Sequence, residues 1–403
     1  MPTIDNQTIN YSLRNLRQRK GRSFLTIFSI LIGIATIFIF ISYGWGLYTY
    51  TESFTTSSSA DKILIMAKGY SGATGGDSSF ALTKDDLDAV EKSSGVYEAT
   101  GVYLQSVQVT KSNENKYVYL MGYDPKKPLM LDLFQAEPEK GRFLRPGDRG
   151  AVLGYNYMVD EKIFNKAYDV NEVIEINGNK VRIIGFMESV GNPADDSNIY
   201  VTNDYFEDLF PEKKSYAELV ARVDIDSMQR TIDNVERNLR KERNLERGKE
   251  DFFVQSFEDM LDSYKGAINI IVGFVILIAL ISVLVSGINT ANTMITSVLE
   301  RYKEIGVLKA IGARNSKIFT IFLFESSFLG FVAGVLGVAI GFGLSWIGGK
   351  ILTSVGYGFL QPHFGWQLFV GCVAFAVLTG AISGVIPAFN ASKTNTVDAL
   401  RYE

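Results

Sequence analysis

The sequence predicts a polytopic α-helical membrane protein with four transmembrane helices and a large α+β extracytoplasmic domain between the first two helices. Three observations lead to this prediction. Four apolar segments are each long enough to cross a bilayer, which takes about 20 residues. Residues 48–266 hold 27 Lys and Arg against 38 Asp and Glu, a net charge of −11, whereas the rest of the chain carries +7. The Lys and Arg residues that flank the apolar segments are also distributed asymmetrically.

The apolar segments are uncharged almost throughout, and the exceptions are Glu325 inside the third one and Lys350 at its end. An isolated carboxylate in lipid is costly, so we expect Glu325 to face the other helices and to find a partner there. Two roles stay open for it: a hinge or gate near the inner leaflet, or a structural hydrogen bond. The transmembrane helices are expected at residues 24–47, 267–299, 318–350 and 366–388.

Lys and Arg residues set the expected orientation in the plasma membrane, because they favour the cytoplasmic side. Five of them lie within residues 14–22 and five within residues 301–317, whereas the external loop 351–365 has none. Both termini, the segment 300–317 and the tail 389–403 are therefore expected in the cytoplasm, and residues 48–266 outside.

The N-terminal residues 1–23 carry a further signal. Ile9, Leu13 and Leu16 recur at helical spacing beside basic residues. This pattern predicts an amphipathic helix in the inner interface, in contact with membrane lipids, and a frayed basic tail is the alternative.

The insert 48–266 alternates short β-rich runs with helical patterns. Thr83 followed by Asp86 predicts a helix N-terminus, and Asn177-Gly178 predicts a tight hairpin turn because both residues tolerate positive φ. Strands are expected to pair at 103–109 and 117–121. We expect a split α/β lobe that holds an inserted β-rich lobe, and a single α+β domain of another kind is the alternative. The α/β lobe should comprise 55–125 and 215–260, and the inserted lobe 126–214.

The sequence carries no catalytic constellation. The Gly-rich run that cradles nucleotide phosphates is absent, and a single His363 and a single Cys372 leave almost no nucleophile–base pairs. Asp195 and Asp196 supply the clustered oxygens that Ca²⁺ prefers, but their place beside Pro193 favours a solvated loop. We therefore expect no enzyme activity, no cofactor and no metal in this chain, and no nucleic-acid partner.

The second apolar segment is rich in Ser, Thr and Asn, which let helices approach closely and hydrogen-bond in lipid. Asn289 and Asn292 join Glu325 as intramembrane polar candidates. They fit a dimer interface and packing inside one subunit equally well.

Residues 300–314 are charged and punctuated by glycine, and they lie between two apolar runs. Their ERxxEIGxxKAxGA pattern resembles the coupling helix of the MacB/FtsX-type ABC-transporter permeases. The resemblance covers nearly the whole chain, including residues 141–186 and the C-terminal stretches 384–388 and 397–403. Two departures are visible: Phe389–Lys393 lacks the family's paired arginines, and no fused ATPase domain precedes the first apolar segment.

The resemblance implies a permease subunit that works as a dimer, with a second copy of itself or a paralogue. It also implies a separate ABC ATPase subunit, which binds ATP and Mg²⁺, and it makes an extracytoplasmic adaptor a further candidate partner. Movement of the ATPases would pass through the coupling helix and the first two transmembrane helices to the outer domain. The task implied is export or extraction of peptides, drugs or lipid-linked cargo. The implied coupling contacts are Glu300, Arg301, Glu304, Ile305, Gly306, Lys309, Gly312 and Ala313.

A different class of function stays open beside export. FtsX-type members of the family act as signalling regulators of an extracellular hydrolase or of an inhibitor-sensing complex. Genome neighbours would discriminate between the two, because an adjacent ATPase with an adaptor supports export and an adjacent hydrolase supports regulation.

Overall fold

The computed structural model describes residues 20–53, 59–68, 81–112, 114–133 and 136–401. The chain divides into two units. The helical unit comprises the residues up to 47, residues 267–351 and the residues from 360 onward, and the sheet unit comprises residues 48–266 and 352–359. The expected amphipathic helix around Ile9, Leu13 and Leu16 lies outside the described residues.

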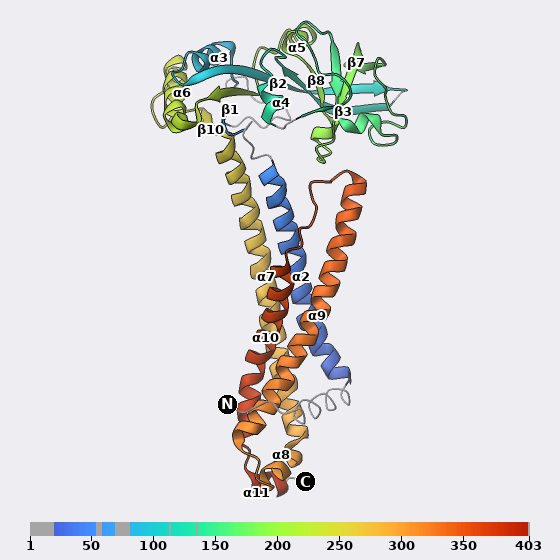
Figure 1. Ribbon diagram of the computed structural model, residues 1–403, viewed down its shortest axis with the longest axis vertical. Helices are drawn as coiled ribbons and strands as arrows, with labels where there is room; N and C mark the ends of the chain where they lie inside the picture. Colours follow the sequence, from blue (N-terminus) through green and yellow to red (C-terminus); the bar gives the residue numbers. More distant parts are fainter. Residues whose placement is uncertain (1–19, 54–58, 69–80, 113, 134–135, 402–403) are drawn as a thin grey trace. The chain divides into compact units, whose positions relative to one another are not determined.

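Four helices are long and apolar enough to cross a membrane, which confirms the predicted number of spans within the described residues (Figure 1). All four run beyond the predicted limits. The second begins at Phe257 instead of 267, because the Ser256 hydroxyl accepts a hydrogen bond from the Asp259 N–H at 2.9 Å and caps it there. The third ends where Gly356 takes φ +106°. The four helices are α2 (Lys20–Ser53), α7 (Phe257–Glu300), α9 (Asn315–Val355) and α10 (Trp366–Ser392).

The helical unit packs through small and hydroxyl-bearing residues. A Cβ placed on Gly330 would lie 2.4 Å from the Ala376 carbonyl oxygen, so α9 and α10 touch backbone to backbone. Hydroxyl pairs join helices at Ser29–Ser286 (3.0 Å) and Ser42–Ser345 (3.2 Å). Close approach and interhelical hydrogen bonds are the forces available to helices in lipid.

The sheet unit contains one sheet of ten strands among the described residues. Along the sheet the order is β10-β1-β9-β2-β3-β8-β5-β7-β4, and β6 pairs with β2 and β7. The strands are β1 (Lys62–Ala67), β2 (Val96–Lys111), β3 (Glu114–Tyr123), β4 (Pro138–Gly141), β5 (Gly150–Leu153), β6 (Val173–Ile176), β7 (Asn179–Met187), β8 (Ile199–Thr202), β9 (Glu218–Val223) and β10 (Phe252–Ser256).

The long strand β2 joins the two expected lobes into this one sheet. Residues 96–102 of β2 pair with β9, and residues 103–111 pair with β3. Strand β3 then pairs in parallel with β8 of the inserted region. The division at residue 126 therefore does not separate two sheets, because β2 and β3, which precede it, pair with β6 and β8, which follow it.

Both faces of the sheet are covered by apolar side chains. Leu219 and Ala221 of β9 point to one core, together with Val235 of α6. Val220 points to the opposite core, with Leu129 and Phe257, as alternation along a strand requires. The remaining helices of this unit are α3 (Lys84–Glu91), α4 (Leu129–Leu133), α5 (Asn203–Leu209) and α6 (Met228–Glu242), with short 3₁₀ turns at Tyr155–Met158, Asp195–Ser197 and Ile225–Ser227.

Two local predictions in this unit are confirmed. Thr83 and Asp86 form a reciprocal capping box at the start of α3. Asn177 and Gly178 take φ values of +47° and +81° in the turn between β6 and β7. The predicted α+β character of the domain between the first two membrane helices is likewise confirmed.

Candidate functional site

The segment between α7 and α9 contains a short helix, α8 (Tyr302–Ala310), which packs against α11 (Thr396–Arg401). The two helices lie side by side in Figure 1. Helix α8 ends in a Schellman motif, in which the Ala313 N–H donates to the Leu308 carbonyl and the Gly312 N–H to the Lys309 carbonyl, both at 3.0 Å. Gly312 takes φ +98°, so Gly312 and Ala313 set the end of the helix.

Arg301 lies at the junction of α7 and α8, and its side chain is buried. One guanidinium nitrogen lies 3.2 Å from the Glu325 carboxylate on α9, and both side chains are 6% exposed. The guanidinium also donates to Glu304 at 3.1 Å and stacks 5.2 Å from the centroid of the Phe322 ring. The expected partner of Glu325 is thus Arg301, and this ion pair joins the start of α8 to α9.

Lys309 reaches from α8 to the end of α10. Its ammonium group donates to the carbonyl oxygens of Ser392 and Thr394, each at 2.7 Å. A cation at the carbonyl end of a helix interacts favourably with the helix dipole. Burial lowers the pKa of Lys309. The inner side of α8 is therefore fixed to both α9 and α10.

The residues predicted as coupling contacts divide into two groups. Arg301, Ile305 and Gly306 are buried inside the helical unit, and Ile305 packs in a core cluster with Phe322 and Ala388. Glu300, Glu304 and Gly312 are exposed, while Lys309 and Ala313 are half-buried.

Sequence reasoning missed two apolar side chains on the outward side of α8. Val307 is 51% exposed and Ile311, just after the helix, is 77% exposed. Together with Lys303 and Glu304 they form what we call the α8 outer face. The spacing of 303, 307 and 311, one helical turn each, was the signal that could have identified it.

The intramembrane asparagines lie away from the closest helix contacts of α7. Asn289 is half-buried and Asn292 is exposed. The contacts to α2 are made instead by hydroxyl groups: Thr293 accepts from Thr26 at 3.3 Å, and Ser286 accepts from Ser29. Hydroxyl groups can also bond back to the preceding helical turn, as Thr290 does to Ser286 at 2.8 Å.

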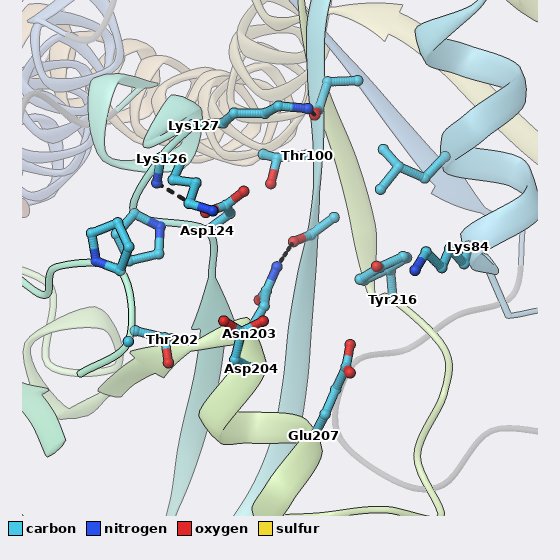
Figure 2. Close-up of a pocket in the computed structure, with 16 residues that line it drawn as sticks. Lys84, Thr100, Asp124, Lys126, Lys127, Thr202, Asn203, Asp204, Glu207 and Tyr216 are labelled. Atoms are coloured by element: carbon cyan, nitrogen blue, oxygen red, sulfur yellow. Dashed lines mark hydrogen bonds between the residues drawn. The ribbon is translucent and has the colours of Figure 1, made fainter. Parts of the chain in front are cut away.

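The sheet unit holds a polar cavity of about 250 Å³ where β2, α3 and α5 meet (Figure 2). Lysines and carboxylates line it, and two polar side chains of the lining are already engaged: the Lys127 ammonium donates to the Ala99 carbonyl at 3.0 Å, and the Asn203 amide donates to the Gly101 carbonyl at 2.9 Å. Burial raises the pKa of Tyr216. The lining includes Lys84, Thr100, Asp124, Lys126, Thr202, Asp204, Glu207 and Tyr216.

Asp195 and Asp196 act as hydrogen-bond acceptors within their loop. The buried Asp196 carboxylate accepts from the Ser189 hydroxyl at 2.7 Å and from the Val190 N–H at 2.8 Å, and Asp195 accepts from the Asn192 amide at 2.7 Å. Among the described residues, no group of three or more His, Cys, Asp and Glu side chains could hold a metal ion.

Comparison with known protein families places these features in context. Residues 23–237 match the MacB-like periplasmic core domain, and residues 276–396 match the FtsX-like permease C-terminal region. The chain belongs to the MacB/FtsX-type family of ABC transporter permeases. It is therefore a multi-pass membrane protein whose sheet unit is its extracytoplasmic domain.

Full-length relatives agree with this family. The chain is 30% identical over 399 residues to an uncharacterized ABC transporter permease, MJ1507, of Methanocaldococcus jannaschii, covering 98% of each chain. It is 26% identical to the uncharacterized ABC transporter permease YknZ of Bacillus subtilis, covering 98% of this chain and 99% of that one. It is 28% identical to the macrolide export ATP-binding/permease protein MacB of Bdellovibrio bacteriovorus, covering 98% of this chain but 61% of that protein.

Two solved domains resemble the sheet unit of this permease. The extracellular domain of YknZ from Gram-positive bacteria matches with a TM-score of 0.38 and 17% identity, covering 48% of this chain and 99% of that domain. The periplasmic region of MacB from Actinobacillus actinomycetemcomitans matches with a TM-score of 0.38 and 14% identity, covering 54% and 98%.

Proposed function

We propose that this permease binds a separate ATP-hydrolysing subunit at the α8 outer face and transmits its movement to the extracytoplasmic sheet unit. The work is export or extraction of peptides, drugs or lipid-linked cargo at the outer surface. ATP and Mg²⁺ bind to the ATPase subunit. The permease acts as a dimer, with α8 and both termini in the cytoplasm, and an extracytoplasmic adaptor is a candidate further partner.

The observation that supports this proposal is the difference between the two sides of α8. Its inner side is fixed by the Arg301–Glu325 ion pair and by the Lys309 hydrogen bonds. Its outer face presents Val307 and Ile311 flanked by charged groups. A helix that is fixed on one side and apolar on the other can bind a partner and transmit its movement to α9 and α10.

The residues of the α8 segment have three different roles in this proposal. We assign contact with the ATPase to Glu300, Lys303, Glu304, Val307 and Ile311. We assign positioning of the helix to Arg301, Ile305, Gly306 and Lys309, and its termination to Gly312 and Ala313. Regulation of an extracellular hydrolase is the second candidate function. The match of residues 23–237 to the MacB-like core domain favours export or extraction.

The test replaces Val307 by Asp and purifies the tagged permease from cells that also express the ATP-binding subunit. A neutral polar group buried without a partner in an apolar contact costs about 1–3 kcal/mol, and a carboxylate costs more. Each 1.4 kcal/mol is about tenfold in affinity, so we expect co-purified Mg²⁺-dependent ATPase activity to fall about tenfold or more. Val173→Asp is the matched control, because Val173 is 52% exposed but lies in the sheet unit.

Glu304→Lys provides a second variant of the same face. It reverses a charge that is 58% exposed and places an ammonium group beside the Arg301 guanidinium. Like charges in a partly desolvated contact cost up to several kcal/mol. Protease resistance of the sheet unit should stay unchanged, which separates loss of the partner from misfolding. If both α8 variants retain the ATPase activity seen with Val173→Asp, the assignment of the docking face is wrong.

A further inference from the structure

Residues 352–359, which form the end of α9 and the start of the connection to α10, belong to the sheet unit rather than to a free external loop. The sequence suggested two connections between the outer domain and the membrane helices, at the ends of the insert 48–266. In the structure two further chain crossings, at 351/352 and 359/360, link the same units. Residues 48–266 continue directly into α2 and α7, and residues 352–359 connect the same unit to α9 and α10.

Specific contacts hold residues 352–359 in the sheet unit. The Phe359 N–H donates to the Gly191 carbonyl at 3.1 Å, and the Lys162 ammonium donates to the Ser354 carbonyl at 3.1 Å. The Phe359 ring lies 5.5 Å from the ring of Tyr50, centroid to centroid. We call residues 189–193 together with 354–359 the clasp.

The backbone around Gly191 is held by contacts that do not involve residues 354–359. Gly191 takes φ +76°, which suits glycine. The Asp196 carboxylate accepts from the N–H groups of Val190 at 2.8 Å and Gly191 at 3.2 Å, and Asp196 is 4% exposed. The Tyr50 hydroxyl donates to the Val190 carbonyl at 3.4 Å. The Gly191 carbonyl is thus held in place as an acceptor for the Phe359 N–H.

The two chains of the clasp approach each other at glycines. A Cβ on Gly191 would lie 3.3 Å from the Phe359 nitrogen, and a Cβ on Gly358 would lie 3.4 Å from the Gly191 Cα. The two backbones therefore lie close together at this point, with little room for a side chain between them.

We propose that the clasp stays closed throughout the transport cycle, so that residues 352–359 and the sheet unit move as one body. Tyr50, Gly191 and Phe359 are then positioning residues of the permease. Any displacement of the sheet unit acts directly on α9 and α10 as well as on α2 and α7. This inference rests on the proposed function and extends its route of transmission from two helices to four.

A reversible disulfide tests the proposal. Gly191→Cys and Gly358→Cys are combined in a Cys372→Ser background, because a disulfide needs Cα atoms about 4.4–6.8 Å apart. Formation of the bond is first measured on the purified permease alone by mass spectrometry, without any ATPase subunit. The two single-cysteine variants control for the substitutions themselves. Because a side chain is strained at the φ of +76° that Gly191 takes, the Gly191→Cys single variant must first keep the parent's hydrogen-exchange protection of residues 352–359. If it does and no intramolecular bond forms under mild oxidation, the clasp is not the resting arrangement and the proposal is overturned. If it does not, the hydrogen exchange of the parent complex decides.

ATPase turnover of the complex is then compared with the disulfide formed and reduced. We expect the two rates to agree within about twofold, because a clasp that never opens is not impeded by a bond across it. A loss of about tenfold on oxidation, restored by a reductant, would show that the clasp opens in each cycle. The Cys372→Ser parent complex is measured first, so a failure of the proposed function appears there and not as an effect of the disulfide.

Hydrogen exchange of the same complex is a second test, because a loop contact without a role in transmission need not stay equally protected in every nucleotide state. The peptide amides of 352–359 should keep the same protection without nucleotide, during ATP hydrolysis and with vanadate. Faster exchange of these amides in any one state would contradict one-body movement.

Discussion

The sheet unit and the helical unit both bury large apolar side chains, yet their elements approach each other differently. The larger core of the sheet unit consists of big aliphatic and aromatic residues such as Ile63, Tyr103 and Phe206. The helical unit also buries Ile34 and Phe38, but in addition its helices touch at Gly330 and Gly380 and at paired hydroxyl groups. Water drives the first kind of packing, because apolar surface is removed from it. Lipid offers no such force between helices, so close approach and hydrogen bonds must supply the stability.

The same contrast extends to buried carboxylates. Glu325 in the helical unit lies 3.2 Å from the Arg301 guanidinium, so its charge is paired. Glu218 in the sheet unit is half-buried on β9, and burial raises its pKa to about 7. A group near water can take up a proton instead of holding a partner. A group deep among membrane helices depends on its partner, and substitutions at the two positions should therefore behave differently.

The largest effect is expected when Glu325 is replaced by Leu. This change leaves the Arg301 guanidinium buried without its carboxylate on α9, which typically costs about 3–5 kcal/mol. We expect a large loss of thermal stability of the helical unit. Thermal unfolding is measured by the fluorescence of Trp45, Trp346 and Trp366, which all lie on membrane helices.

The double variant Arg301→Met/Glu325→Leu provides the control, because replacing both partners by apolar side chains is often close to neutral. It should recover most of the stability lost in the single variant. If the single and double variants are equally unstable, the ion pair is not the reason for the loss.

The sequence was sufficient for features that depend on neighbouring residues. Thr83 caps its helix and Asn177-Gly178 turns its hairpin because the chemistry of each lies within a few residues. The expectation that Glu325 has a partner followed from the cost of an isolated charge in lipid. Its identity did not follow, because Arg301 and Glu325 meet only when α7 and α9 pack together.

Long-range geometry explains what the sequence could not supply. The single sheet depends on how far β2 extends past its first partner. The place of residues 352–359 depends on contacts with residues distant in sequence, among them the Gly191 carbonyl and the Lys162 ammonium group. On α8 the family motif predicted contacts at Arg301 and Ile305, which are buried. It did not predict the exposed Val307 and Ile311, because Val and Ile residues are common in any helix of this kind.

A smaller effect is expected from two glycines of the same helix, α10. A Cβ on Gly380 would lie 2.5 Å from the Ser326 carbonyl oxygen, whereas a Cβ on Gly371 would meet nothing within 4 Å. Gly380→Ala should therefore force α9 and α10 apart at a cost of about 1–3 kcal/mol. Gly371→Ala should be neutral, or stabilising by up to about 1 kcal/mol through helix propensity.

Thermal unfolding of the two alanine variants, followed by the same tryptophans, makes this comparison. Equal stability of the two variants would show that backbone contact between α9 and α10 does not hold the helical unit together.

The smallest effect is expected from Glu218→Gln in the sheet unit, and it should depend on pH. In the unfolded chain a Glu has a pKa of about 4.3, whereas burial raises the pKa of Glu218 to about 7. Between these values the folded protein binds a proton that the unfolded chain has lost, so the free energy of unfolding of the parent falls as pH rises. Gln carries no charge at any pH. The variant should match the parent near pH 4 and exceed it above pH 7, by on the order of 1–2 kcal/mol because partial exposure reduces the penalty.

Pulse proteolysis of the sheet unit in urea, on the full-length permease, measures this difference. Glu139→Gln is the matched control, since it makes the same substitution at an exposed position on β4. A Glu218→Gln advantage that is the same at pH 4.5 and pH 8 would contradict titration of the buried carboxyl. An advantage that grows with pH would show that the sheet unit tolerates a buried carboxyl by protonating it, whereas the helical unit relies on Arg301.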